Sequence, residues 1–310
     1  MDYIKKRISV ERQSDLFGLF KSAFGISPTP ESLAAKHDTS FTGVRDVGLI
    51  AYAPDGQPAG YYGVFPVYVR VNGKKYLIAQ SGDTMVHPNH TGKGLFTTLA
   101  KLTYDIAKAE KIKGVFGFPS PSSYPGFMKH LEWQHHVNIH RYRFIVPMLP
   151  ISEFFWRFRA VRRILLAWQS LLFGMFKTAN MFPGSLMDGN FDCIDRSECY
   201  SSYKLAQPEV RVIRVAGIEA VIKLEGSLGI GDINSTNPRQ IRHLIRQLKI
   251  ICFFSGIHRI NTYLSPDCPL DRALGKLASP ARGLPIGYVD FSKQFSQRNV
   301  LYCYLDMDTF

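Results

Sequence analysis

The feature that most constrains this chain is a glycine-rich turn between a strand pattern and a helix pattern. The spacing predicts a strand over residues 74–86 and an amphipathic helix over residues 95–110, with Gly92-Lys93-Gly94 between them. A helix start leaves four backbone N–H groups unpaired and carries a partial positive charge, so it favours an anion. The glycines permit positive φ and close approach, and Lys93 adds a charge. The turn therefore predicts a phosphate-binding junction that would accept a pyrophosphate.

The spacing of the glycines excludes two common phosphate motifs. A P-loop has four residues between its glycines, followed by Lys and Ser or Thr. A dinucleotide fingerprint has a third glycine three residues further on. Neither pattern follows Gly92 and Gly94. Taken alone, the turn also fits a strand-to-helix connection that binds nothing.

The residues on both sides of the turn resemble motif A of the GNAT acyltransferases. Met85-Val86-His87-Pro88 matches the apolar-Val-x-Pro strand end, and Asn89-His90-Thr91-Gly92-Lys93-Gly94 matches the loop Arg/Gln-x-x-Gly-x-Gly/Ala, with Asn89 in place of the charged or amide residue. The resemblance implies that the loop amides bind the pyrophosphate of acetyl-CoA and that an amide of Met85 or Val86 polarises the thioester. The coenzyme-binding residues implied in this way are Met85, Val86, Asn89, His90, Thr91, Gly92, Lys93, Gly94, Leu95 and Ser120.

A second stretch resembles the next GNAT motif. A short strand pattern over residues 114–118 is followed by a polar turn, a short helix, Leu131-Glu132-Trp133 and another strand. The opening strand pattern and the two helices after it resemble a GNAT acceptor-side wall. The resemblance covers residues 1–146 and implies an α+β GNAT fold, with a mixed, mostly antiparallel sheet flanked by helices.

The second half repeats this order of elements. Strands are predicted at 210–216, 218–225, 229–233, 257–263, 286–291 and 300–305, with helices at 238–254 and 269–277. The corresponding turn, residues 232–238, contains no glycine. We therefore predict a catalytic GNAT domain at 1–146, an amphipathic helical linker at 147–190, and a degenerate GNAT-like domain at 191–310. The last would not bind CoA and would complete the acceptor pocket or stabilise the first domain.

The linker is predicted to be helical from Ile151 to Phe182, with a basic face. Its apolar run, residues 164–176, is too short for a bilayer, which needs about 20 residues. Two interpretations stay open. The segment lies on an anionic membrane as a peripheral contact, or its apolar face packs between the two halves while its arginines face water.

Composition and charge limit the partners without choosing one. A net charge of +13 concentrates anions near the surface, whether CoA phosphates, nucleotide-sugars, nucleic acid or acidic lipid. All five cysteines lie in the second half, without Cys-x-x-Cys spacing and without a secretory leader ahead of them. This pattern favours a cytoplasmic location and cysteines that act as small buried hydrophobic residues.

The resemblance implies direct transfer in a ternary complex, so no nucleophile is needed. The family's usual acid, a tyrosine, falls on Phe127 or Met128, neither of which can donate a proton. Tyr124 is the nearest phenol and is our candidate acid, with a packed aromatic as the alternative. Asp83 and His87 are candidate bases, with capping of strand-end amides as the alternative.

No metal site is expected. His87 and His90 flank the proposed phosphate loop, and residues 135, 136 and 140 alternate across a strand, so neither group converges on one ion. Asp306 and Asp308 fit turn or strand-end positions better than ligand positions.

The leading hypothesis is an acetyl-CoA-dependent N-acetyltransferase. The Ser-Tyr-Pro-Gly-Phe turn at residues 123–127 resembles GNAT enzymes of surface-polysaccharide biosynthesis, which implies a small-molecule amine acceptor, an amino sugar or a nucleotide-linked amino sugar. Two alternatives are a tandem-GNAT aminoacyl transferase using charged tRNA and a non-catalytic acyl-CoA-binding protein. Tandem-GNAT aminoacyl transferases generally lack a functional CoA loop, whereas this chain keeps the loop at residues 89–94. Nucleic acid is therefore not the expected partner.

Overall fold

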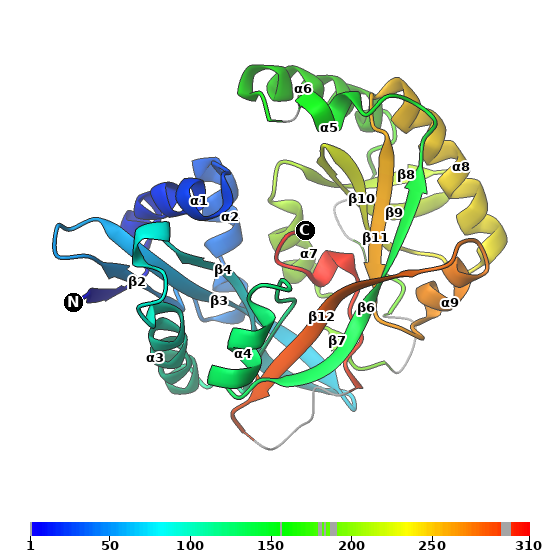
Figure 1. Ribbon diagram of the computed structural model, residues 1–310. Coiled ribbons are helices and arrows are strands. Elements are labelled where there is room, and N and C mark those ends of the chain that lie inside the picture. Colours follow the sequence, from blue (N-terminus) through cyan, green and yellow to red (C-terminus); the bar gives the residue numbers. More distant parts are fainter. Residues whose placement is uncertain (1, 156, 179–181, 183, 187–190, 293–298) are drawn as a thin grey trace. The chain divides into compact units, whose positions relative to one another are not determined.

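The computed structural model describes residues 2–310 apart from 156, 179–181, 183, 187–190 and 293–298 (Figure 1). The chain divides into two compact units. The first unit comprises Met1–His136 and Pro285–Asn299, and the second comprises Val137–Leu284 and Val300–Phe310. These boundaries differ from the predicted domains, because residues 137–146 lie in the second unit and 285–299 lie in the first.

The first unit is built on a mixed sheet. Its strand order is β1 (Ile4–Arg7), β2 (Gly48–Tyr52), β3 (Pro58–Val71), β4 (Lys74–Val86), β5 (Gly114–Gly117) and β12 (Ala281–Asp290). Neighbours run antiparallel except β4 and β5, which are parallel. Asn72-Gly73, a dipeptide typical of tight hairpins, joins β3 to β4 with φ of 50° and 75°. Positive φ at both central residues is what a tight two-residue hairpin turn requires.

Helices cover both faces of this sheet. A 3-10 turn, η1 (Val10–Asp15), leads into α1 (Leu16–Phe24), and α2 (Pro30–His37) and the short η2 (Ser40–Thr42) follow. α3 (Leu95–Ala109) and α4 (Tyr124–His130) come later in the chain. Side chains alternate along β3, so Tyr61 lies in the core shared with α1 and Tyr62 in the core shared with α3. The sheet is therefore filled by separate cores on its two faces.

The second unit repeats this arrangement. Its strand order is β6 (Gln134–Ile145), β11 (Arg259–Leu264), β10 (Ser227–Ile233), β9 (Ile218–Glu225) and β8 (Val210–Val215), and only β10 and β11 are parallel. α8 (Pro238–Phe254) connects the parallel pair, as α3 does in the first unit, and α9 (Pro269–Gly275) follows β11. The predicted mixed, mostly antiparallel sheet flanked by helices is confirmed.

The prediction of one helix from Ile151 to Phe182 is wrong. The chain forms α5 (Ile151–Phe155) and α6 (Arg159–Gly174), and residue 156 and residues 179–181 lie outside the described residues. After Gly174 the backbone turns to pair with β8. Thr178 N–H donates to the Val212 carbonyl at 3.2 Å, and Arg214 N–H donates to the Phe176 carbonyl at 2.7 Å.

The prediction of a strand at 300–305 is also wrong. Leu301 and Cys303 make single bridges, and residues 304–306 form the 3-10 turn η5 (Tyr304–Asp306). The Asp306 carboxylate accepts from the Cys303 backbone N–H at 2.8 Å, which closes the chain into a turn. The sequence analysis did not predict α7 (Glu198–Leu205) or the two-residue strand β7 (Cys193–Ile194).

Candidate active site

The glycine turn lies where β4 ends and α3 begins. A 3-10 turn, η3 (Pro88–His90), follows β4, and Gly92 and Gly94 adopt φ of 73° and 72°. Gly94 is the N-cap of α3. No heavy atom lies within 4 Å of where a Cβ would stand on either glycine. The backbone on this side of the turn is therefore open to a ligand.

The start of α3 presents a row of unpaired amides. The first backbone bond of the helix is donated by Thr98 N–H to the Gly94 carbonyl, at 3.0 Å. Within the described residues, none of the N–H groups of residues 92–97 has a recorded acceptor, and α3 has no acidic residue in its first turn and no side-chain cap. Such a helix end favours an anion.

The side chains of the turn stabilise the turn itself. The Asn89 N–H donates to His87 Nδ1 at 3.2 Å, and the Thr91 hydroxyl donates to the Pro88 carbonyl at 2.9 Å. Tyr3 Oη lies 2.9 Å from His90 Nδ1. The Lys93 ammonium donates to the Asn89 carbonyl at 3.1 Å. These bonds fix the turn while leaving its glycine amides available.

A pocket of about 310 Å³ borders the turn. It is lined by six residues, two of them lysines: Asp2, Tyr3, Lys5, Lys93, Leu95 and Thr98. Lys5 and Lys93 provide the positive charge that a phosphate group beside the turn would need.

The strand before the turn has an open edge. Among the described residues, the paired positions of β4 and β5 are Ala79 with Val115 and Gln80 with Phe116, whereas β4 continues to Val86. The N–H of His87 donates to the Ala59 carbonyl on the β3 side, at 2.9 Å. Because successive strand amides point in opposite directions, the Val86 N–H points away from β3, toward the open edge.

Asp83 lies at a β-bulge in β4. The register with β3 shifts between Tyr61 and Gly63, and Asp83 has φ of 52°. The bulge turns its side chain toward α2, where Oδ1 accepts from the Lys36 ammonium at 2.6 Å. His37 Nε2 stands 3.9 Å from the other oxygen, Oδ2.

The second oxygen of Asp83 is buried and available. Among the described residues, neither Asp83 Oδ2 nor His37 Nε2 has a hydrogen-bond partner. Burial, and after it the charge of Lys36, lower the pKa of His37 to about 3, so this ring is neutral at ordinary pH. Lys36 and His37 were not among the predicted site residues, because nothing local to α2 connects them with residue 83.

The other predicted catalytic residues lie on separate elements. Tyr124 is the first residue of α4, and its ring centroid is 5.9 Å from that of His135. His87 stays with the turn, and its ring centroid is 5.8 Å from that of His90. Ser120 bonds with the hydroxyls of Ser122 and Ser123 and is exposed.

The position of the family's usual acid belongs to the core. Phe127 is 4% exposed, and its ring centroid lies 4.4 Å from that of Trp133 and 5.0 Å from that of Phe96. Met128 packs partly against the same core. Within the described residues, no three His, Cys, Asp or Glu side chains are placed to hold a metal ion.

The equivalent region of the second unit is filled by its own chain. β10 also pairs with β11 over two recorded positions, but a Cβ on Gly231 would lie 2.6 Å from the Phe310 ring and one on Gly229 would lie 2.9 Å from Tyr304. The start of α8 is capped by Asn237, whose side chain accepts from the Arg239 N–H at 2.9 Å. The helix start that has no side-chain cap in the first unit is therefore capped here, and the rings of Tyr304 and Phe310 pack on β10.

Comparison with known proteins addresses the fold and the domain. Residues 6–136 match a family model described as an acetyltransferase (GNAT) domain. No curated protein sequence matches the chain. A GCN5-related N-acetyltransferase from Kribbella flavida superposes with a TM-score of 0.59 at 12% identity, over 94% of this chain and 72% of its own. One from Anabaena variabilis gives 0.52 at 11%, over 93% and 72%.

A third solved structure extends the likeness beyond the acetyltransferases. N-myristoyltransferase from Saccharomyces cerevisiae, solved with bound myristoyl-CoA, gives a TM-score of 0.58 at 10% identity, over 97% of this chain and 85% of its own. At such identities the likeness concerns the fold, and the family model matches residues 6–136 only. The protein has the GNAT fold, and its residues 6–136 match the family model of the GNAT acetyltransferase domain.

Proposed function

We propose that the protein is an acetyl-CoA-dependent N-acyltransferase that transfers an acetyl group to a primary amine. The observation that carries the proposal is the row of amides without acceptors at residues 92–97, on a turn held open by two positive-φ glycines. A pyrophosphate would satisfy these donors, and Lys93 and Lys5 would face its negative charge or that of a neighbouring phosphate. Pantetheine would then follow the edge of β4 that β5 leaves open.

The chemistry requires few protein groups. The neutral amine attacks the thioester carbonyl carbon, and the Val86 N–H donates to the oxygen as it becomes negative. The carbon–sulfur bond then breaks, and the departing thiolate takes a proton, for which Tyr124 is the candidate donor. Before the attack, the substrate ammonium gives one proton to Asp83 and becomes the neutral amine. After the attack, the nitrogen of the tetrahedral adduct loses a second proton, which replaces the one that Tyr124 gave to the thiolate. Each step uses a group that the fold holds on β4 or at the start of α4.

Asp83 also fits the recognition of an amine. A cation already lies at one of its oxygens, the Lys36 ammonium at 2.6 Å, while the other has no partner among the described residues. The ammonium group of an acceptor would pair with the second oxygen of this carboxylate. We propose an amino sugar or a nucleotide-linked amino sugar as the acceptor, because the turn at residues 123–127 resembles GNAT enzymes of surface-polysaccharide biosynthesis.

The proposal is tested by thiol release from acetyl-CoA and by calorimetric CoA binding. Gly92→Val/Gly94→Val places β-branched side chains at positive φ beside the amides, and we expect CoA binding and thiol release to be lost. Gly73→Val is the matched control, since Gly73 has φ of 75° and equally open surroundings but lies in the β3–β4 hairpin. Unchanged CoA binding by the double variant, or equal loss in the control, would contradict the site.

The same assay separates catalysis from coenzyme binding. Asp83→Asn and Tyr124→Phe should each lower turnover by about 10²–10⁴-fold while CoA affinity stays near that of the wild type. Asp105→Asn, an exposed carboxylate on α3, is the control and should leave turnover unchanged. Wild-type turnover in either variant would remove that residue from the mechanism.

The acceptor is identified by varying the amine in the same assay. The panel comprises amino sugars, nucleotide-linked amino sugars, aminoglycosides and polyamines. Fastest thiol release with an amino sugar or its nucleotide would support the proposed acceptor, and fastest release with a polyamine would overturn it. Transfer from charged tRNA without any CoA thiol release would overturn the proposed reaction itself.

A further inference from the structure

Helix α6 has two apolar stripes, and only one of them faces the core. Phe173 is fully buried, and Leu166 packs against the core of the second unit. On another side, Ile164, Leu171 and Met175 are 69%, 64% and 69% exposed, and Trp168 between them is 46% exposed. The spacing of these four residues, 4-3-4, is that of one helical face. A stripe of this kind on a soluble surface marks an interaction site.

Neighbouring elements extend the outer stripe. α5 contributes Phe154, 54% exposed, and the carboxyl end of α8 contributes Phe253 and Phe254, 50% and 64% exposed. The Trp168 indole N–H donates to the Phe254 carbonyl at 3.0 Å, so α6 is attached to that end of α8. Figure 1 shows α5 and α6 together at this end. We call these exposed side chains of α5, α6 and the end of α8 the apolar face.

The net charge of the segment that carries α5 and α6 is positive. No acidic residue occurs between Glu153 and Asp188, and Glu153 is paired with Arg259 at 3.1 Å. The Arg157 guanidinium lies over the Phe154 ring, 4.8 Å from its centroid. Basic side chains therefore occur within the apolar face, and its acidic neighbour is neutralised.

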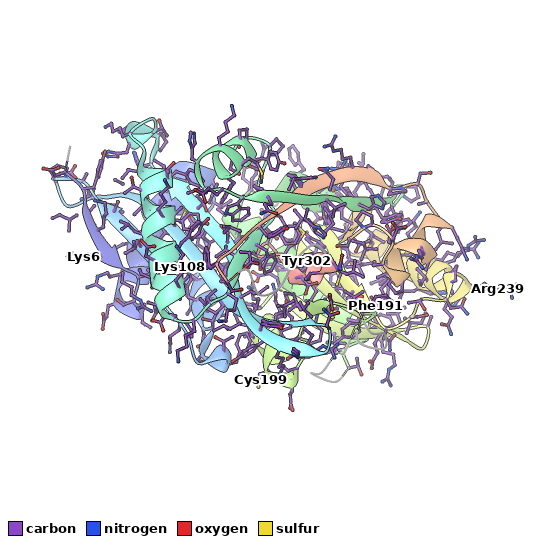
Figure 2. All side chains as sticks on the ribbon, turned by 90° about the horizontal axis from the view of Figure 1, so that it is seen from below. Lys6, Lys108, Phe191, Cys199, Arg239 and Tyr302 are labelled. Atoms are coloured by element: carbon purple, nitrogen blue, oxygen red, sulfur yellow. The ribbon has the colours of Figure 1, made fainter. Side chains whose placement is uncertain are left out.

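α8 continues the positive charge away from the apolar face. The helix contains no Asp or Glu, and Arg239, Arg242, Arg246 and Lys249 recur at intervals of 3, 4 and 3 residues on one side. Figure 2 shows Arg239 at the far end of α8, with its side chain directed outward. We call these four residues the basic stripe of α8. It ends beside Phe253 and Phe254.

We propose that the apolar face and the basic stripe of α8 together bind the surface of an anionic phospholipid bilayer. Ile, Leu, Phe and Trp side chains would enter the headgroup region, while arginine and lysine would pair with phosphates. Nucleic acid would match the charge but would leave the aliphatic stripe of α6 exposed. A second copy of the chain would bring two basic surfaces together. No helix among the described residues is long and apolar enough to cross a membrane.

The test is co-sedimentation of the full chain with vesicles of phosphatidylcholine alone or with 30% phosphatidylglycerol. We expect binding to the anionic vesicles and little to the neutral ones. Ile164→Ser/Leu171→Ser/Met175→Ser should lower the partition coefficient at least about tenfold. The matched control is Val10→Ser/Phe24→Ser/Ile26→Ser, three exposed apolar residues of the first unit, which should bind as the wild type.

The basic stripe has its own variant. Arg242→Gln/Arg246→Gln/Lys249→Gln should lower the partition coefficient about a hundredfold. Lys21→Gln/Lys74→Gln/Lys101→Gln removes the same charge from exposed positions elsewhere and should have a much smaller effect. Thiol release should be normal in all four variants, so the result is independent of the proposed reaction.

Three outcomes would overturn the proposal. The first is vesicle binding that depends on neither the lipid charge nor these residues, which would appear as equal binding to neutral and anionic vesicles or as wild-type binding by both the α6 serine variant and the α8 glutamine variant. The second is a concentration-dependent dimer that the serine variant abolishes while vesicles are ignored. The third is retention on tRNA or duplex DNA that the glutamine variant abolishes, again without vesicle binding.

Discussion

At the scale of single residues, the site depends on two backbone conformations that few residues adopt. Gly92 and Gly94 take positive φ in the turn, and Asp83 takes φ of 52° in the bulge. The first opens amides to a ligand, and the second turns a carboxylate toward α2. His37 is the buried group opposite that carboxylate, and the pH dependence of the free energy of unfolding tests its protonation state.

The acid sensitivity of the first unit should depend on His37. The unfolded ring binds a proton below pH 6.5, but the folded ring does so only near its pKa of about 3. Its contribution to the free energy of unfolding is therefore complete above pH 6.5 and is lost as the pH falls toward 3. Between pH 7 and pH 5 the loss is about 2 kcal/mol.

We expect His37→Phe to remove that part of the pH dependence in urea unfolding. Phenylalanine keeps an aromatic ring near Phe65, whose centroid lies 5.2 Å from that of His37. The control is His130→Phe, a change at an exposed position, and its free energy of unfolding should depend on pH as that of the wild type does. Parallel curves for wild type and His37→Phe between pH 7 and pH 5 would show that the ring is not buried in its neutral form.

The sequence located the glycine turn but not the Lys36–Asp83 pair, for a physical reason. The glycine turn is local, since its strand end, loop and helix start occupy about twenty consecutive residues. The Lys36–Asp83 pair joins positions 47 apart and exists only when α2 packs on the sheet. Nothing in a lysine followed by a histidine on a short helix indicates such a partner.

At the scale of elements, boundaries were predicted well where local chemistry sets them. α8 begins with Asn237 as its cap and Pro238 in the first turn, and both were visible in the sequence. β4 begins after an Asn-Gly hairpin. The predictions failed where tertiary pairing decides the conformation. Phe176 to Thr178 leave the helix to bond with β8, and Asp306 closes a turn in a stretch with strand propensity.

At the scale of the whole molecule, each unit has a sheet with one parallel pair among antiparallel ones, but the two interiors differ. The second unit contains a buried ion cluster. Arg196 donates to Asp306 at 2.8 Å and approaches Asp232 at 3.5 Å, and all three side chains are at most 1% exposed. Asp232 also accepts from the Ser185 hydroxyl at 2.7 Å. A charge removed from such a cluster leaves its partners buried and unpaired.

The arginine of this cluster should therefore be costly to replace. Arg196→Met should lower the free energy of unfolding by about 3–5 kcal/mol in urea or thermal unfolding. Arg214→Met is the matched control, because Arg214 also pairs with a carboxylate, Glu219 at 2.6 Å, but its side chain is 60% exposed. That variant should cost less than about 1 kcal/mol. Equal losses in the two variants would contradict the account.

The strand order of the first unit also has a consequence for synthesis of the chain. β5 is completed by Gly287–Asp290, which pair with Gly114–Gly117, so Gly287 follows its partner Gly117 by 170 positions (287 − 117). At about 5–20 residues per second, a ribosome emits the partner roughly 10–30 s after β5. During that interval one side of β5 is an uncovered edge, the kind of edge that invites mispairing. A nascent chain would therefore gain from a chaperone at this point.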